Sequence, residues 1–265
     1  MKRLLALLTI LLFLLSLSAC ASQPAEPTVL LTEPTEPPTT IPPTEAPTEA
    51  PTVAETAPSH SLLYIPGLDE EDVIRYFNEV CLDAEFQISG DASVLQKWAT
   101  PMSYTINGAP TDEDLAILTD FTAWLNTIDG FPGIAPSDDP IFANLRIHFC
   151  TQQELLDLMD SSYTDLDGAM TFWYDNNEIY DAIICIRTDL DQYVRNSVIL
   201  EEIYNTLGPA QDTSLRTDSI IYSEYSEPQS LTEIDELILK LLYHPDLQCG
   251  MNADECEAVI RQLYD

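Results

Sequence analysis

One stretch of this 265-residue chain decides how its fold is interpreted: Leu200-Glu201-Glu202-Ile203-Tyr204-Asn205-Thr206-Leu207-Gly208. Residues four apart share one face of a helix, so Glu201 and Asn205 lie on the same face, with Glu202 next to Glu201. Gly208 and the following Pro209 end such a helix, because glycine suits a helix C terminus and proline cannot continue the helix. The stretch therefore predicts a helix that carries two adjacent carboxylates and then stops.

Helices and strands alternate on the N-terminal side of this stretch. Hydrophobic periodicity and capping signals predict the following order: a helix over 69–86, a strand at 101–106, a helix over 111–130, a strand at 143–149, a short helix after Thr151, strands at 170–174 and 179–186, and the motif helix over 191–207. The connection Asp175-Asn176-Asn177-Glu178 is typical of a hairpin turn. Two more helices, over 232–243 and 252–264, are expected to close the core. The fold class is α/β (α+β), a single domain with a twisted mixed sheet.

The motif stretch resembles the active-site helix of the zincin metallopeptidases. In those enzymes His-Glu-x-x-His sets two imidazoles on one helical face to hold Zn²⁺, and the glutamate acts as general base on the metal-bound water. A glycine and a third ligand often follow. The zincin helix packs under a twisted sheet whose edge strand lines the substrate cleft, and the predicted order of elements is compatible with that arrangement.

The zinc ligands are missing from the motif. Counted back from Gly208, the first histidine position holds Glu201, the general-base position holds Glu202 and the second histidine position holds Asn205. The third-ligand position falls on Gln211, with Asp212 beside it. The resemblance therefore implies a degenerate zincin-like domain, in which Glu202 is the catalytic residue if the domain is active.

No metal site is predicted, and zinc is expected to be absent. An amide such as Asn205 is too weak a ligand to replace an imidazole on Zn²⁺. Oxygen atoms of Glu201, Asn205 and Asp212 would suit a harder ion such as Ca²⁺, which stays open as an alternative. The three histidines are dispersed along the chain, at His60, His148 and His244.

The first 20 residues have the pattern of a lipoprotein signal peptide. A basic start at Lys2 and Arg3 precedes an apolar run to Leu17, which is too short to span a membrane as a mature helix. The run ends in Leu17-Ser18-Ala19-Cys20, a lipobox, which makes Cys20 the expected lipidation site and first mature residue. We therefore expect an extracytoplasmic protein that a lipid anchors to the cell membrane of a bacterium.

Residues 21–61 form a segment rich in proline, threonine and glutamate, and they have almost nothing apolar to bury. Such a composition predicts a disordered, extended stalk. The remaining residues, 62–265, are long enough for one globular domain with a sizeable core.

The chain is strongly acidic. Without the signal peptide it has 8 basic and 45 acidic residues, a formal net charge of −37. This charge excludes nucleic acid and anionic lipid surfaces as favourable partners.

Five cysteines follow Cys20, and an odd number cannot all pair within an exported chain. Cys249 and Cys256 flank a short connection and are the expected disulfide. Cys150 and Cys185 lie in strand-like runs and are interpreted as small buried hydrophobic residues.

A second resemblance covers most of residues 70–260. Glu-Glu-x-x-Asn-x-Leu-Gly followed by Gln211-Asp212-Thr213, then Asp235-Glu236-Leu237, Leu241-Leu242-Tyr243-His244-Pro245 and Gly250-Met251, is similar to the bacterial domain-of-unknown-function family 2927. Members usually carry Gln at the position of Asn205. The family is zincin-like with a degenerate metal site and no established activity, so the resemblance implies architecture more than chemistry.

The sequence favours a membrane-anchored lipoprotein with a non-catalytic, zincin-like binding module at the cell envelope, so an enzyme is not the first expectation. Its expected ligand is a protein, peptide or glycan of the envelope, and no cofactor is predicted. Two alternatives stay open: a metal-dependent hydrolase or peptidase with Glu202 as general base, and an envelope scaffold whose function lies in the stalk and anchor.

Overall fold

The computed structural model describes residues 65–82, 93–159, 166–224 and 227–264, all of which belong to one compact unit, residues 56–265. The predicted lipobox at Cys20, the stalk over 21–61 and His60 lie outside the described residues. Along the chain the elements are α1 (Glu70–Leu82), β1 (Lys97–Trp98), β2 (Met102–Gly108), α2 (Asp112–Leu125), β3 (Ile134–Pro136), β4 (Leu145–Cys150), α3 (Gln152–Met159), β5 (Gly168–Asp175), β6 (Glu178–Arg187), α4 (Gln192–Thr206), α5 (Glu233–Leu242) and α6 (Ala253–Tyr264).

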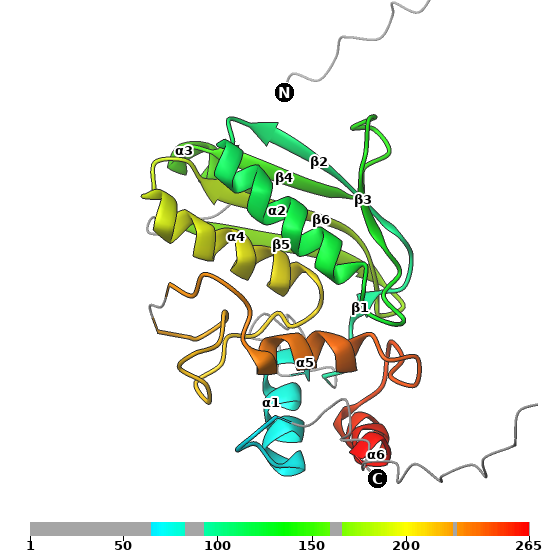
Figure 1. Cartoon of the computed structure of the whole chain (residues 1–265). Helices are drawn as coiled ribbons and strands as arrows, with labels where there is room; N and C mark the ends of the chain where they lie inside the picture. Colours follow the sequence, from blue (N-terminus) through cyan, green and yellow to red (C-terminus); the bar gives the residue numbers. More distant parts are fainter. Residues whose placement is uncertain (1–64, 83–92, 160–165, 225–226, 265) are drawn as a thin grey trace, which may run out of the picture. The chain divides into compact units, whose positions relative to one another are not determined.

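Six strands form one mixed sheet in the described part of the chain (Figure 1). Its path is β1-β6-β4-β2-β3, and these neighbours are all parallel. β5 is antiparallel to β6 and pairs with it along nearly its whole length, so β1 and β4 share the opposite edge of β6. β5 is therefore an edge strand, and the predicted α/β fold with a mixed sheet and a hairpin is confirmed.

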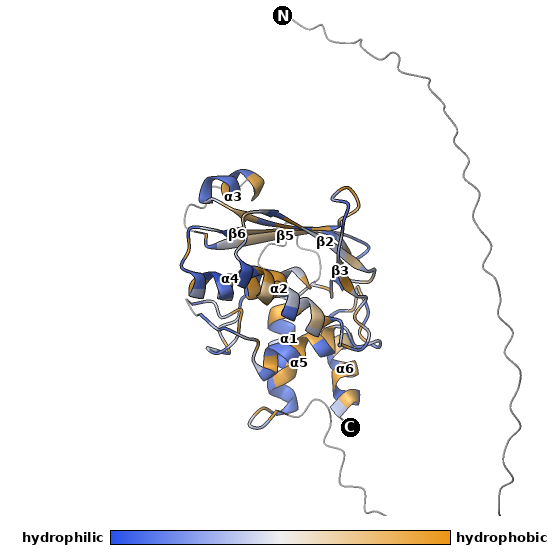
Figure 2. Cartoon of the chain, turned by 45° about the horizontal axis from the view of Figure 1, so that its top comes forward, coloured by the Kyte–Doolittle hydropathy of each residue, from blue (hydrophilic) through white to orange (hydrophobic). Residues whose placement is uncertain are grey.

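The strands alternate between buried and more exposed side chains, as a sheet with one covered face requires. In β4, Leu145, Ile147 and Phe149 are at most 3% exposed and belong to the main core, whereas Arg146 and His148 lie on the other face and are partly exposed. Figure 2 shows α2 and α4 together on one side of the sheet and α3 on the other. We call the side with α2 and α4 the inner face.

The hairpin between β5 and β6 turns at two asparagines. Asn176 and Asn177 have φ angles of 50° and 66°, the left-handed conformation that a two-residue hairpin turn needs and that asparagine tolerates. The register shifts between Trp173 and Tyr174, which pair with Asp181 and Ile179, so one residue of β6 is left over as a β-bulge. The predicted hairpin is confirmed and is longer than expected at both ends.

The remaining helices α1, α5 and α6 lie below the sheet and its inner helices (Figure 1). A buried polar chain joins α1 to α5: the hydroxyl of Tyr76 donates to Ser219 Oγ at 2.7 Å, and Ser219 donates to Asp235 Oδ1 at 2.7 Å. Asp235 also accepts from the Thr232 backbone N–H in the capping box of α5. Because each polar group is hydrogen-bonded, this network is compatible with burial.

Two strands, β1 and β3, were not predicted, and helix α2 ends earlier than predicted. The short strands β1 and β3 have no periodic signal of their own. α2 ends at Leu125 rather than at Gly130, because the side chain of Asn126 donates to Ile134 O at 2.8 Å and accepts from Ile134 N at 2.9 Å. This pair of hydrogen bonds ties the helix end to β3.

The cysteines in the described residues are free thiols, including Cys249 and Cys256, for which a disulfide was expected. The two sulfurs have different surroundings: Cys249 Sγ lies 3.7 Å from Lys97 O, and Cys256 Sγ lies 4.0 Å from Met251 O. Cys150 and Cys185 are buried under α3, in agreement with their interpretation as small core residues.

Among the described residues, no helix combines the length and the apolar composition needed to cross a membrane.

Candidate functional site

Helix α4 carries the motif, and its N-terminal half is fixed by a buried ion pair. Arg195 Nε donates to Asp114 Oδ1 at 2.9 Å, and the two side chains are 6% and 0% exposed. Asp114 is also the capping-box residue of α2, so this ion pair joins α4 to α2. Removing one partner of a buried pair leaves an uncompensated charge, which makes this contact costly to break.

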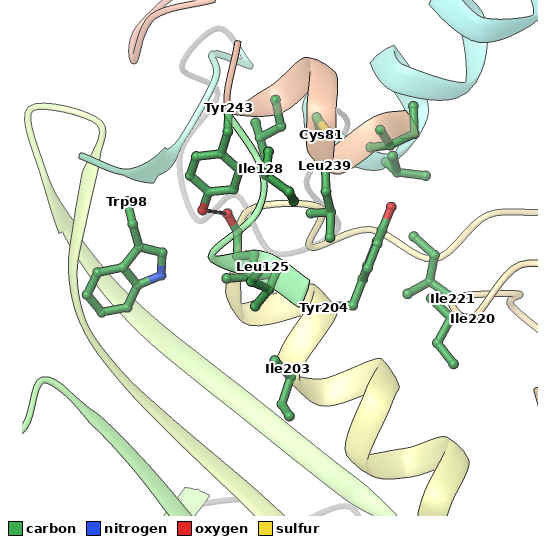
Figure 3. Close-up of a cluster of buried hydrophobic side chains, with 14 of the residues drawn as sticks. Cys81, Trp98, Leu125, Ile128, Ile203, Tyr204, Ile220, Ile221, Leu239 and Tyr243 are labelled. Atoms are coloured by element: carbon green, nitrogen blue, oxygen red, sulfur yellow. Dashed lines mark hydrogen bonds between the residues drawn. The ribbon is translucent and has the colours of Figure 1, made fainter. Parts of the chain in front are cut away.

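The C-terminal end of α4 is fixed by side chains from other elements (Figure 3). The indole N–H of Trp98 donates to Thr206 O at 2.9 Å, and the hydroxyl of Tyr243 donates to Leu207 O at 2.8 Å. The last carbonyls of a helix have no partner inside the helix, so such donors satisfy groups that would otherwise be orphaned. The motif therefore sits on a helix held at both ends.

A steric contact that could not be predicted from the sequence requires glycine at position 208, where the helix ends. Its φ is 134°, and a Cβ added there would lie 2.6 Å from Gln96 O. A side chain would therefore require both a strained backbone and a displaced neighbouring strand connection.

Glu202 is buried against the edge strand. It is 8% exposed, and a Cβ added at Gly168, the first residue of β5, would lie 2.6 Å from Glu202 Oε1. Burial raises the pKa of Glu202 well above its usual range, and the charges of Glu201 and Asp212 raise it further. Glu202 therefore favours its neutral, protonated form more strongly than an exposed glutamate does.

Glu201 titrates near neutrality. Burial is the main cause, and the negative charges of Asp212 and Asp167 add to it, so that the pKa of Glu201 is raised to about 7. Neither Glu201 nor Glu202 has a side-chain hydrogen bond or ion pair with another described residue. We call Glu201, Glu202, Asp212 and Asp167 the carboxyl cluster.

Two amide side chains of the predicted motif have buried oxygens without a partner. Asn205 is 9% exposed and lies one helical turn after Glu201, and its Oδ1 accepts no hydrogen bond from the described residues. Gln211 Oε1 is also buried without a partner, while its Nε2 donates to Asp212 O at 3.4 Å. Unpaired buried oxygens next to carboxylates make a site that can accept hydrogen bonds but offers few donors.

The donor set does not fit a resident zinc ion. In the described part of the chain, no group of three or more His, Cys, Asp and Glu side chains is arranged to hold a metal. His148 lies on the outer face of the sheet, and His244 follows α5 and lies 3.8 Å from Asp246. The motif positions themselves carry carboxylates and amides, which are poor substitutes for the nitrogen and sulfur ligands that zinc prefers.

Chemically, the arrangement of Glu201 and Glu202 favours a positively charged group beside them. Like charges raise the pKa values of Glu201 and Glu202, so a cation placed among them would lower those pKa values and release protons. Asp167 of the cluster already has a basic partner, because Arg187 Nη1 donates to Asp167 Oδ1 at 3.2 Å, whereas the two glutamates have none among the described residues.

Comparison with known families places these residues in a wider group. Residues 70–262 match the family described as "Protein of unknown function (DUF2927)". The chain belongs to the DUF2927 family. No curated protein matches the sequence.

The DUF2927 match contains the whole carboxyl cluster and every element from α1 to α6 except the last two residues of α6. Cys20 and the predicted stalk over 21–61 lie outside it. The sequence pattern identified Glu201, Glu202, Asn205 and Asp212 but missed Asp167 and Gly168 of the edge strand region. The packing of β5 against α4 brings those two residues to the motif, and no local signal in the sequence reports that packing.

Proposed function

We propose that this DUF2927 protein is a lipid-anchored, extracytoplasmic binding protein whose zincin-like domain no longer hydrolyses peptides. The carboxyl cluster binds a basic group of an extended ligand in the cell envelope. The observation that carries the proposal is the adjacent pair of a buried Glu202 and a partly buried Glu201, neither of which has a basic partner among the described residues. Ionising both neighbouring carboxyls without a counter-charge is costly, which is why their pKa values are raised, and a cationic ligand lowers that cost.

The arrangement of β5 and α4 supports the zincin-like part of the proposal. In zincins the motif helix packs under a sheet whose edge strand lines the substrate cleft. Here α4 packs against β5 and β6, and Gly168 of β5 touches Val198 and Glu202 of α4. As an edge strand, β5 also offers unpaired backbone groups, to which an extended peptide can add as a further strand.

The raised pKa of Glu202 favours binding over catalysis. A general base must be ionised before it accepts a proton, and burial together with the charges of Glu201 and Asp212 makes ionisation of Glu202 less favourable. In a zincin the metal and its histidines supply the compensating positive charge. None of the three ligand positions carries a histidine in this chain.

Binding of capped hexapeptides that differ at one central residue tests the proposal. The purified full chain is titrated calorimetrically with lysine, arginine and norleucine peptides at pH 6 and pH 8. We expect the two basic peptides to bind more tightly than the norleucine peptide. Their affinity should rise by about tenfold from pH 6 to pH 8, because Glu201, with a pKa of about 7, becomes ionised over that interval.

Two variants complete the test. Glu202→Gln removes a carboxylate of the cluster and should abolish the preference for lysine over norleucine. Glu233→Gln removes an exposed carboxylate from the first turn of α5 and should leave that preference intact. Equal binding of all three peptides, or binding of none, contradicts the proposal; cleavage of the peptides would support the hydrolase alternative instead.

A further inference from the structure

The inner face of β5 meets acidic side chains at both of its ends. Gly168 and Tyr174, six residues apart, pair with Ile186 and Ile179, which are 0% and 1% exposed and belong to the main core. Directly opposite residues of a sheet share one face, so positions 168 and 174 both face the side of α4. Glu202 of the carboxyl cluster lies against Gly168. The cluster therefore adjoins the first of these two positions.

The other end of β5 opens into a pocket of about 590 Å³. We call it the hairpin pocket, and its lining residues are Tyr174, Asp175, Asn176, Glu178 and Tyr180. The two tyrosines are 53% and 51% exposed, and neither Asp175 nor Glu178 forms an ion pair with another described residue. Tyrosine ring faces and carboxylates both attract a cation, whereas an uncharged group gains from the rings alone and an anion is repelled. The pocket therefore favours a basic side chain.

Between the two ends, β5 presents apolar side chains on the same face. Met170 and Phe172 pair with Ile184 and Ala182 and pack against the main core while staying partly exposed. In the described part of the chain β5 has no strand on its other edge, so its outward backbone groups are available to an added strand. Such a strand would place side chains beside Met170 and Phe172 and its ends beside the two acidic sites.

The geometry of a strand sets the distance between the two sites. Six residues at about 3.3 Å each span about 20 Å, and side chains return to the same face only after an even number of residues. Tyr180, the extra residue of the bulge, lies in β6, so β5 itself counts six residues without interruption. Two basic residues of an added strand therefore reach both sites when they are six positions apart. A spacing of five or seven sends one of them to the outer face.

We propose that β5 binds an extended peptide with two basic residues six positions apart, one at the carboxyl cluster and the other in the hairpin pocket. The proposal rests on the binding function proposed above for the carboxyl cluster, and it adds a second contact and a spacing rule. Apolar residues two and four positions after the first basic residue complete the pattern, because they lie beside Met170 and Phe172. The pattern is symmetric, so it holds for parallel and antiparallel addition alike.

Capped nonapeptides test the spacing. The parent peptide has lysine at its second and eighth positions, valine at its fourth and sixth, and serine elsewhere. Exchanging its last lysine with the preceding serine gives a spacing of five, and exchanging its first lysine with the preceding serine gives seven, with composition and charge unchanged. Two further peptides carry norleucine in place of the second lysine or of both lysines.

The purified full chain is titrated calorimetrically with each peptide at pH 8. We expect the parent to bind about tenfold more tightly than the single-lysine peptide, because it alone adds an ion pair and a ring contact in the hairpin pocket. The two exchanged peptides should stay within about twofold of the single-lysine peptide, since either lysine can occupy the carboxyl cluster but not both sites at once.

Variants locate the second contact. Asp175→Asn combined with Glu178→Gln removes both carboxylates of the hairpin pocket and should lower the affinity of the parent to that of the single-lysine peptide, whose own affinity should not change. Asp138→Asn combined with Glu233→Gln removes two exposed carboxylates from the loop after β3 and from α5, and should leave the advantage of the parent intact. Circular dichroism checks that both double variants are folded.

The results separate this proposal from the one on which it rests. Equal affinities of the parent and the exchanged peptides, or an advantage of the parent that persists without the two pocket carboxylates, overturn the spacing rule. In either case, tighter binding of the single-lysine peptide than of the lysine-free peptide would still support the carboxyl cluster as a binding site. If no lysine peptide binds, both proposals are wrong.

Discussion

At the scale of single residues, the burial of Glu202 opposes the ionisation of its carboxyl group. Its raised pKa means that the folded state retains a proton that the unfolded state loses above the usual carboxyl pKa of about 4.5. The unfolded state therefore binds fewer protons over this range, and stability falls as pH rises through it. Glu201 adds to the same trend up to its pKa of about 7. Both carboxyls contribute fully to stability only at acidic pH.

Replacing Glu202 by glutamine tests whether ionisation of this carboxyl destabilises the folded state. Glu202→Gln should raise the free energy of unfolding by about 1–3 kcal/mol at pH 8, because the neutral amide has no charge to desolvate, and should change it little at pH 4. Urea unfolding at the two pH values measures the difference. The exposed control Glu233→Gln should show no such pH dependence. A loss of stability for Glu202→Gln at pH 8 would mean that Glu202 is ionised and paired in the folded protein.

The two missing histidines give a second prediction at this scale. The wild-type protein should purify without stoichiometric zinc, because Glu201 and Asn205 replace both imidazole ligands. Glu201→His combined with Asn205→His restores His-Glu-x-x-His around Glu202 and should create measurable Zn²⁺ affinity, whether or not activity appears.

Zinc titration of the wild type, both single variants and the double variant measures the effect. Each single variant should bind more weakly than the double variant, since one imidazole chelates poorly. Tight zinc binding by the wild type would restore the hydrolase alternative. No gain in the double variant would mean that the side chains at 201 and 205 do not share an accessible face.

At the scale of elements, the end of α4 depends on the absence of a side chain. Gly208→Ala combines a left-handed φ of 134° with a Cβ 2.6 Å from Gln96 O, and should lower the free energy of unfolding by about 3 kcal/mol or more. Gly67→Ala is the matched control: its φ is 86°, but a Cβ there meets nothing within 4 Å, so only the backbone cost of about 1 kcal/mol is expected. If thermal or urea unfolding gave the same loss of stability for both variants, the contact with Gln96 O would not contribute to the effect of Gly208→Ala.

Most elements could be predicted because their signals are local. Helical spacing, the capping pairs and the Asn176-Asn177 turn are read from neighbouring residues, and the structure places α4, α5, α6 and the hairpin within a few residues of the prediction. The two-residue β1 and the three-residue β3 could not be found this way. They exist only through pairing with β6 and β2, strands distant in the sequence.

The candidate site was only partly predictable for the same reason. The spacing from Gly208 identified Asp212, and Asp212 does act electrostatically on both glutamates. The donors that fix the C-terminal end of α4, Trp98 and Tyr243, come from β1 and the end of α5. The remaining member of the carboxyl cluster, Asp167, directly precedes β5, and its neighbour Gly168 begins that strand. Tertiary pairing alone brings these residues together.

At the scale of the whole molecule, the proposed anchor makes a prediction about location. Cys20→Ala removes the only residue of the lipobox that can be acylated, and a stalk rich in proline and acidic residues gives no other means of retention. We therefore expect the variant to move from the membrane fraction to the soluble fraction and to lose labelling by a fatty-acid analogue. Ser18→Thr, which keeps the cysteine, is the control and should remain membrane-bound. Unchanged lipid labelling of Cys20→Ala would show that the lipobox interpretation is wrong.

The contacts of α1 have a mechanical consequence. α1 is the first described element after the proposed stalk, so tension between the anchor and the domain loads it first. Its residues also hold the loop that carries Asp212: Glu79 accepts from Thr213 Oγ1 at 2.6 Å, and Val80 O accepts from Gln211 N at 3.3 Å. Pulling α1 away would free Asp212 from the two glutamates and lower their pKa values. We therefore expect tension on the proposed stalk to make the domain release protons. Mechanical stress in the envelope would then change the charge of the carboxyl cluster.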